Sequence, residues 1–189
     1  MTRKQEIIVT ASTMFKNQGY RAVTMRLLAK EIGVKAAALY NHINSKQEIL
    51  QIIAFDIAHK FTNGLIGLDD KNFTPMEKIK KVISHYIAVT IQNPNGVECL
   101  EKNWIYLEGE QLIEYRMLRE NFEKNIKAII VEGIAIEQFK KTNPDVMLQF
   151  FLYVLRSINN WYAYNTQIDE AILKEDINTL LVSALIRES

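Results

Sequence analysis

A chain of 189 residues, 48% of them hydrophobic and 24% charged, is long enough to bury a substantial core and has the composition of a globular protein. It contains no run approaching the roughly 18 apolar residues that a membrane-spanning helix needs, and its first residues, MTRKQEIIVT, contain no apolar signal segment. We therefore expect a cytoplasmic protein with no membrane partner.

The net charge of the whole chain is only +1, but positive charge is concentrated near the amino terminus. The first 50 residues contain eight Lys or Arg and three Glu, a net charge of +5. The other 139 residues contain 15 basic and 19 acidic residues, a net charge of −4. We expect the basic end to face a polyanion.

The chain has a single cysteine, Cys99, which excludes an internal disulfide. With no second thiol nearby it does not indicate a metal site. Its apolar neighbours favour a small buried hydrophobic residue over a reactive thiol.

The first predicted helix has apolar residues at helical spacing from Ile7 to Phe15, and Gly19 in NQGY is expected to end it at a left-handed cap position. Thr24 is a predicted N-cap for the short helix MRLLAKEI, which Gly33 ends. The apolar residues that this second helix is expected to bury are Leu27, Leu28 and Ile32.

A third short helix follows the glycine and is expected to pack through Val34, Ala38 and Leu39. Ser45 is predicted to cap a fourth helix, with Glu48 three residues later completing a capping box. Two short helices joined by a glycine turn and braced by a longer helix on each side form a helix-turn-helix.

The rest of the chain also has helical spacing. The fourth helix is expected to run to Gly64, GLDDKNFTP is a loop, and Pro75 begins a helix whose buried face contains Ile79, Val82, Ile83, Tyr86, Ile87 and Thr90. NPNG and KKTNPD are further breaks. Residues 145–165 are apolar nearly all round. A last helix has apolar residues at Leu173, Ile177, Leu180, Leu181, Ala184 and Leu185. No segment has the period of two that a strand needs, so the prediction is an all-α protein of about nine helices.

The third helix suits the major groove of DNA. Small residues at its front, Ala36, Ala37 and Ala38, let the backbone approach base edges, and Lys35 can reach an acceptor on guanine. Arg26 on the preceding helix points at the same groove. Each residue alone also has a structural explanation, but their order and shared basic context favour DNA contact. The polar residues expected to hold the sugar-phosphate backbone behind this front are Tyr40, Asn41, His42 and Lys46.

Roughly residues 5–50, including TASTMFKNQGYRAVTMRLLAKEIGVKAAALYNHINSKQEIL, resemble the DNA-binding domain of the tetracycline-repressor (TetR) family. The resemblance rests on five short motifs: the helix-ending GY, the T-x-R-x-L-A helix, the GV turn, the LY-x-H helix and the following SK. It implies a homodimeric, all-helical transcriptional regulator, usually a repressor, whose carboxy-terminal domain binds a small effector. It also implies phosphate contacts for Thr24, Tyr40, His42 and Lys46, and base readout by Arg26 and residues 35–37.

Two departures from this family pattern leave the bases that are read open. Many members have a lysine and then a glycine where this chain has Ala36 and Ala37, and a serine is frequent at the position of Lys35. The predicted domains are 1–47, a three-helix helix-turn-helix DNA-binding domain, and 48–189, a helical bundle for effector binding and dimerisation.

Because residues 145–165 are apolar on nearly all sides, we expect a four-helix interface between two copies through the last two helices. Both faces could instead be covered within one chain. LRSINNWYAYNTQIDEAILKEDI also resembles a subgroup of the family that responds to acyl-CoA thioesters. Asn103 and Asn159 are informative because a buried amide needs a partner, and a ligand is one such partner. The predicted effector-site residues are Tyr86, Asn103, Trp104, Tyr115, Phe122, Phe151, Leu155, Asn159 and Tyr162.

An enzyme is the main alternative class. The three histidines, His42, His59 and His85, have no metal-ligand spacing, and no glycine-rich phosphate loop indicates a cofactor. The acids Glu98, Glu101, Glu108 and Glu110 are interpreted as a solvated face. We therefore expect no catalysis, metal or cofactor. A ligand-independent architectural DNA-binding protein is the other alternative, and it predicts weak sequence preference and no enclosed pocket.

Overall fold

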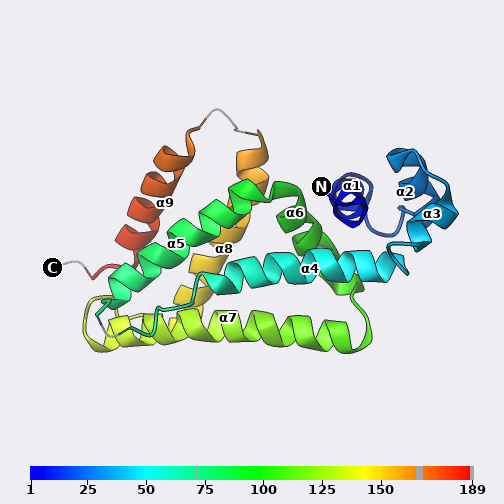
Figure 1. The fold of residues 1–189 in the computed structure, drawn as a ribbon. Coiled ribbons are helices and arrows are strands. Elements are labelled where there is room, and N and C mark those ends of the chain that lie inside the picture. The colour runs from blue at the N-terminus through cyan, green and yellow to red at the C-terminus, as the bar shows by residue number, and fades with distance from the viewer. Residues whose placement is uncertain (71, 165–167, 188–189) are drawn as a thin grey trace. The chain divides into compact units, whose positions relative to one another are not determined.

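A computed structural model describes residues 1–70, 72–164 and 168–187 of the chain (Figure 1). The predicted all-α architecture is confirmed, with nine α-helices and one 3₁₀ helix in the described residues. No helix among them has the length and apolarity to cross a bilayer. The elements are α1 (Arg3–Gln18), α2 (Met25–Ile32), α3 (Ala36–Tyr40), α4 (Lys46–Asn63), α5 (Pro75–Gln92), α6 (Pro94–Asn103), η1 (Trp104–Tyr106), α7 (Gly109–Ala135), α8 (Pro144–Tyr164) and α9 (Glu170–Leu185).

The helices form two compact units, and each unit is built from two separate stretches of chain. The first unit contains Met1–His59 and Asn93–Met117, so that α6 and η1 belong with α1 to α3. The second contains Lys60–Gln92 and the chain from Leu118 onward. The predicted division at residue 47 concerns functional domains and stays a prediction.

The turns of the first unit end helices at the predicted glycines. Gly33 ends α2 as predicted and adopts the left-handed conformation, with φ 77° and ψ 29°, whereas Gly19 combines φ 81° with ψ 145°. The prediction of a left-handed helical cap at Gly19 was therefore wrong, although the positive φ still favours glycine there. The hydroxyl of Thr24 caps α2 by accepting from the backbone N–H of Leu27 at 3.2 Å, as predicted.

Leu27 itself is 42% exposed, which corrects the prediction that α2 buries it. Leu28 and Ala29 take the buried face of this eight-residue helix. Because successive residues of a helix are rotated by about 100°, Leu27 is turned away from the face that Leu28 and Ala29 define.

Only one of the two hydrogen bonds of the predicted capping box at α4 forms as expected. The hydroxyl of Ser45 accepts from the backbone N–H of Glu48 at 3.0 Å, as expected. The Glu48 carboxylate, however, accepts from the backbone N–H and side-chain amide of Asn44, at 2.7 and 2.8 Å. The backbone hydrogen bond from Asn44 holds the pKa of Glu48 below its ordinary value.

The second unit has its core where α5, α8 and α9 pack together with the later part of α7. The predicted buried face of α5 is confirmed at all six positions. A Cβ on Gly133 of α7 would lie 2.2 Å from the ring of Phe139, so the absence of a side chain lets that ring pack on the helix. The side chains buried most completely from the other helices include Ile126, Ile130, Phe151 and Leu155.

Within one chain, α8 is covered on one side only. Phe151, Leu155 and Ile158 are buried in the core of the second unit. On other sides of the helix, Tyr153 is 77% exposed, and Phe150 and Trp161 are exposed by almost half. The predicted helix of residues 145–165 ends at Tyr164 in the structure, and residue 165 lies outside the described residues.

Candidate DNA interface and effector site

The short helix α3 is held in place from beneath by two buried side chains. Leu39 and Ile43 are each 1% exposed, which fixes the helix on the first unit. Its front is small: Ala37 is exposed and Ala36 is partly buried. The front of the helix therefore presents alanine methyl groups, which leave room for an approaching duplex.

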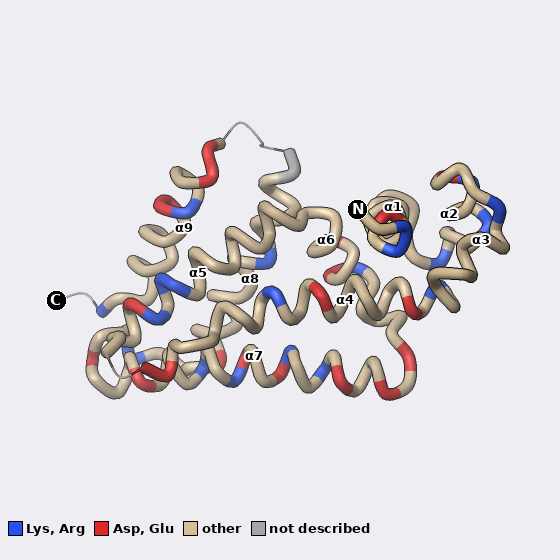
Figure 2. Tube along the Cα trace, in the orientation of Figure 1, with Lys and Arg blue, Asp and Glu red and all other residues tan. Residues whose placement is uncertain are grey.

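Most of the polar residues predicted to contact DNA surround this front and are exposed. Lys35 is the N-cap residue of α3, and its side chain is exposed, so that its ammonium can donate to a partner. Figure 2 shows Lys and Arg on α2 and in the turn that leads into α3, and Lys30 of α2 is a further exposed cation. The exposed members of the predicted set are Thr24, Arg26, Lys35, Tyr40, Asn41 and His42.

Lys46 differs from the other predicted DNA contacts because it is partly buried and bound within the chain. Its ammonium donates to the backbone carbonyls of Tyr20 and Val23, at 2.8 and 2.9 Å. It also lies 4.2 Å from the centre of the Tyr20 ring. Burial lowers the pKa of Lys46. The side chain therefore ties the loop between α1 and α2 to the start of α4, a role that sequence reasoning did not find.

A column of aromatic rings continues from this lysine. The rings of Tyr20 and Tyr106 are stacked at 5.4 Å between centroids, and the guanidinium of Arg21 lies 5.0 Å from the centre of the Tyr106 ring. The side-chain amide of Gln47 donates to the carbonyl of Tyr106 at 2.6 Å. Burial, followed by the nearby Glu108 carboxylate, raises the pKa of Tyr20 to about 12. This column joins η1 to the loop that precedes the helix-turn-helix.

The amide of Asn103 strengthens the same junction. Its Oδ1 accepts from the backbone N–H of Tyr20, and its Nδ2 donates to the carbonyl of Cys99 at 2.9 Å. The structure thus supplies protein partners for both polar atoms of this predicted effector residue. Cys99 is fully buried, as expected of a small hydrophobic residue, and burial raises the pKa of its thiol to about 12.

A charged cluster joins α1 to α6. Lys16 forms an ion pair with Glu98 at 2.9 Å, and Lys102 pairs with the other oxygen of the same carboxylate. Burial opposes ionisation of Glu98, but hydrogen bonds from Lys102 and Lys16 hold its pKa below the ordinary value. The interpretation of Glu98 as part of a solvated face was therefore wrong. Glu108 and Glu110, by contrast, are exposed.

The predicted effector-site residues are divided between the two units. Asn103, Trp104 and Tyr115 belong to the first unit, where the rings of Trp104 and Tyr115 lie 5.7 Å apart. The other six belong to the second unit: Tyr86, Phe122, Phe151, Leu155, Asn159 and Tyr162.

Asn159 is the predicted effector residue with an unmet hydrogen bond. It is 3% exposed, and its Nδ2 has no acceptor among the described residues. Its neighbours on α8, Leu155 and Ile158, are buried in the core. A buried amide donor without an acceptor costs free energy, so this position favours an additional oxygen acceptor.

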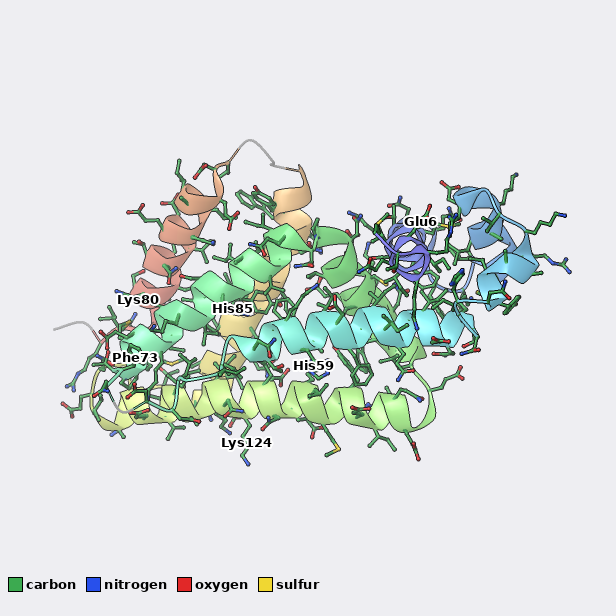
Figure 3. The ribbon with its side chains drawn as sticks, in the orientation of Figure 1. Glu6, His59, Phe73, Lys80, His85 and Lys124 are labelled. Carbon is green, nitrogen blue, oxygen red and sulfur yellow. The ribbon has the colours of Figure 1, made fainter. Side chains whose placement is uncertain are left out.

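Polar contacts also join α5 to the end of α4. Nε2 of His85 lies 2.7 Å from the carbonyl oxygen of Lys60, so that Nε2–H is the donor. The His85 ring occupies the space beside Gly64, where an added Cβ would lie 2.2 Å from the ring. Figure 3 shows His85 extending from α5 toward α4.

The second unit also contains a hollow that the predicted effector residues do not line. A space of about 290 Å³ is bordered by the turns after α4, the start of α5 and the middle of α7. Lys78 and Glu132 form an ion pair on its wall at 2.9 Å. Sequence reasoning missed this hollow, because a lysine in PMEKIKK reads as a solvated side chain.

Comparison with known families and proteins agrees with this arrangement. Residues 7–53 match the family described as "Bacterial regulatory proteins, tetR family", and residues 72–185 match the family described as "Tetracyclin repressor-like, C-terminal domain". The nucleoid occlusion factor SlmA of Vibrio campbellii is 30% identical over 133 residues, which are 69% of this chain and 67% of that protein.

Two solved structures have the same fold. The ketosteroid transcriptional regulator KstR2 of Mycobacterium tuberculosis has a TM-score of 0.91 at 17% identity, with 99% of this chain and 96% of that chain covered. AibR, solved in complex with isovaleryl coenzyme A and operator DNA, has a TM-score of 0.82 at 18% identity, with 96% and 98% covered. At these identities the likeness concerns the fold alone.

Proposed function

Because the chain belongs to the tetR family of bacterial DNA-binding regulatory proteins, which are not enzymes, we propose that it is a homodimeric repressor released from a palindromic operator by a small effector. The observation that carries this proposal is α3: a helix with small residues in front and basic and polar residues around it, fixed by Leu39 and Ile43. Such a helix fits the major groove and leaves its flanking side chains to the phosphates.

The proposed contacts divide into two kinds. Arg26, Lys35, Ala36 and Ala37 read bases, since they lie at the front of the motif. Thr24, Tyr40, Asn41, His42 and Lys46 contact phosphates. Lys46 donates to two carbonyls within the chain, so one of its three N–H groups is left for a phosphate.

The exposed face of the last two helices supports a dimer. Tyr153, Phe150 and Trp161 of α8 and Ile172 and Leu180 of α9 are all at least 45% exposed. Large apolar groups on one face typically mark a protein interface. A twofold axis through a four-helix contact of α8 and α9 would relate two copies of α3, and two copies read a palindrome.

The effector is proposed to bind in the carboxy-terminal domain. The unmet Nδ2 of Asn159 among the buried aromatic and aliphatic residues supports a largely hydrophobic ligand with an oxygen acceptor. An acyl-CoA-like compound is one candidate, favoured by the resemblance of residues 155–177, of which 165–167 lie outside the described residues, and by the isovaleryl coenzyme A bound to AibR.

The proposed mechanism is a population shift. Effector binding favours a conformation in which α5 and the end of α4 move, which changes the separation of the two recognition helices. A coupling free energy of about 1–3 kcal/mol would lower operator affinity by roughly 5- to 150-fold.

Selection of bound sequences from a random DNA pool tests this function. We expect a palindromic site, a dimer in sedimentation equilibrium, and release of a fluorescent operator by a ligand found in a screen. A monomer that binds no duplex at low salt would contradict the proposal.

The SlmA similarity supports a second candidate, a ligand-independent DNA-binding protein with a role in nucleoid occlusion. This candidate predicts that no ligand changes DNA affinity. Measuring operator affinity across a metabolite library therefore separates the two.

A further inference from the structure

The hollow of about 290 Å³ in the second unit is lined by both apolar and polar side chains. Its apolar residues include Leu65 and Leu68, from the turns after α4, and Ile129 of α7. Its polar residues include Lys78 of α5 and Asn125 and Glu132 of α7. None of these six residues was predicted to bind an effector.

Lys78 has unmet donors at this wall. Its side chain is only 9% exposed, and its ammonium donates to Oε2 of Glu132 at 2.9 Å. Among the described residues that carboxylate is its one acceptor, which leaves two N–H groups without a protein partner. These two N–H groups can therefore donate to an oxygen atom supplied from the hollow.

Glu132 supplies the complementary group. Its side chain is 47% exposed, and within the described parts of the chain its Oε1 accepts no hydrogen bond. Donors of Lys78 and an acceptor of Glu132 that no described protein group uses therefore lie next to each other. A hydroxyl group both accepts and donates, and satisfies this pair of requirements.

Charge and size restrict the ligand further. Lys78 and Glu132 already neutralise one another, and Asp69 adds a negative charge to the lining. An anion would have to displace Glu132 and face Asp69, whereas a cation would face Lys78. Like charges about 4 Å apart repel by roughly 4 kcal/mol near a protein surface. The volume is just below the roughly 300–1,000 Å³ of ligand pockets, so the hollow is too small to enclose a whole coenzyme A thioester.

We propose that this hollow binds a small, uncharged compound whose hydroxyl or carbonyl oxygen accepts from Lys78 and whose hydrocarbon part packs on Leu65, Leu68 and Ile129. The identification of this compound as the effector rests on the proposed function. Binding itself does not.

Three six-carbon probes with different head groups test the site: 1,2-hexanediol, hexanoate and hexylammonium. The charged probes have the longer alkyl tails, so apolar burial alone would favour them over the diol. Amide NMR signals of residues 65–69 and 121–132 report binding to the protein without DNA. We expect saturable shifts with the diol and at least about tenfold weaker binding of both charged probes, a difference of about 1.4 kcal/mol. No saturable shift with the diol, or equal binding of all three probes, would overturn the proposal.

Two variants test the residues. Lys78→Met should weaken diol binding by at least about tenfold. Lys80→Met is the matched control, because Lys80 is an exposed lysine on the same helix (Figure 3), and it should leave binding unchanged. Glu132→Gln removes the competing carboxylate, so hexanoate should now bind more tightly than the diol. This reversal keeps the proposal testable if Lys78→Met does not fold, and an unchanged preference would count against it.

A separate titration distinguishes this site from the proposed function. If the diol binds and also lowers affinity for the selected operator, both proposals are supported. If it binds without changing DNA affinity, the site stands and its role as the effector site fails. If it does not bind, the site fails while release by another ligand can still support the repressor.

Discussion

Oδ1 of Asn103 accepts a hydrogen bond from the backbone N–H of Tyr20 at 3.3 Å, across 83 positions of sequence. The bond joins the end of α6 to the loop between α1 and α2, where both groups are buried. The amide also donates to Cys99, so both of its polar atoms act within the protein. Asn103 is thus a structural link in the unit that carries α3.

Replacing this amide should destabilise the protein. Asn103→Leu leaves the Tyr20 N–H buried without an acceptor, and we expect a loss of about 1–3 kcal/mol in the free energy of unfolding. Urea denaturation followed by circular dichroism measures it. Asn125→Leu, a change at a partly exposed amide, is the control and should cost less. Equal losses for both variants would mean that the buried hydrogen bond contributes little.

The ring of Tyr106 should stabilise the first unit through the column of Tyr20 and Arg21. Tyr106→Leu removes one aromatic stack and one cation–π contact, so we expect about 1–2 kcal/mol lower stability. Tyr106→Phe keeps the ring and should be close to wild type. If the phenylalanine variant loses as much in thermal denaturation as the leucine variant, the stacked ring is not the source of the effect.

Glu98 should make stability sensitive to acid. Because its folded pKa lies below the ordinary 4.5, the folded state binds fewer protons than the unfolded state in that range, and its contribution, present above the unfolded pKa, is lost as pH falls. Unfolding measured from pH 7 downward should show Glu98→Gln less stable by about 1–3 kcal/mol at neutral pH, with a flatter decline below about pH 5. Glu110→Gln, at an exposed acid, should follow the wild-type curve.

Lys35 and Tyr40 should affect DNA binding in different ways. Lys35→Ala removes a base contact and should change the preference among operator variants by about 1–3 kcal/mol at one base pair. Tyr40→Phe removes a phosphate contact and should weaken binding to all sequences about evenly. Fluorescence anisotropy with a set of single-base operator variants measures both. An equal effect of both changes on every sequence would argue against direct readout by Lys35.

Gly64→Ala should disturb the contact between α4 and α5. The new methyl group would overlap the ring of His85, so the ring must move and its hydrogen bond to Lys60 is lost. We expect a destabilisation of about 1–3 kcal/mol. In a double-mutant cycle, most of this loss should vanish in a His85→Ala background, where no ring remains to be displaced. Additive losses in the double mutant would contradict the assignment.

Much of the fold could be predicted because its signals are local. Gly33 ends α2 in the left-handed conformation, Pro75 begins α5, and Thr24 caps α2, each through the chemistry of a single residue type. The α5 face from Ile79 to Thr90 was also predicted correctly, since a helix with one apolar stripe has one way to bury it.

The sequence predictions were wrong or incomplete where residues distant in sequence determine the surroundings of a side chain. Glu98 is charged and followed by a lysine four residues later, which is typical of a solvated helix, and only the approach of Lys16 makes it a buried partner. Lys46 looks like a free cation until the carbonyls of the α1–α2 loop are placed around it. The effector residues stay a prediction, because they were chosen mainly from apolar or aromatic stripes, and a stripe does not distinguish a filled core from a pocket.

The path of the chain through its two units limits how the protein can be divided. The sequence passes from the first unit to the second after His59, returns at Asn93 and leaves again after Met117. A fragment cut at residue 47 would lose the partners that Tyr20, Lys16 and Gln47 find in residues 93–117. A chimera that joins this helix-turn-helix to the effector domain of another protein should therefore include α6 and η1. A gene fusion with a single junction after residue 47 would leave both elements out.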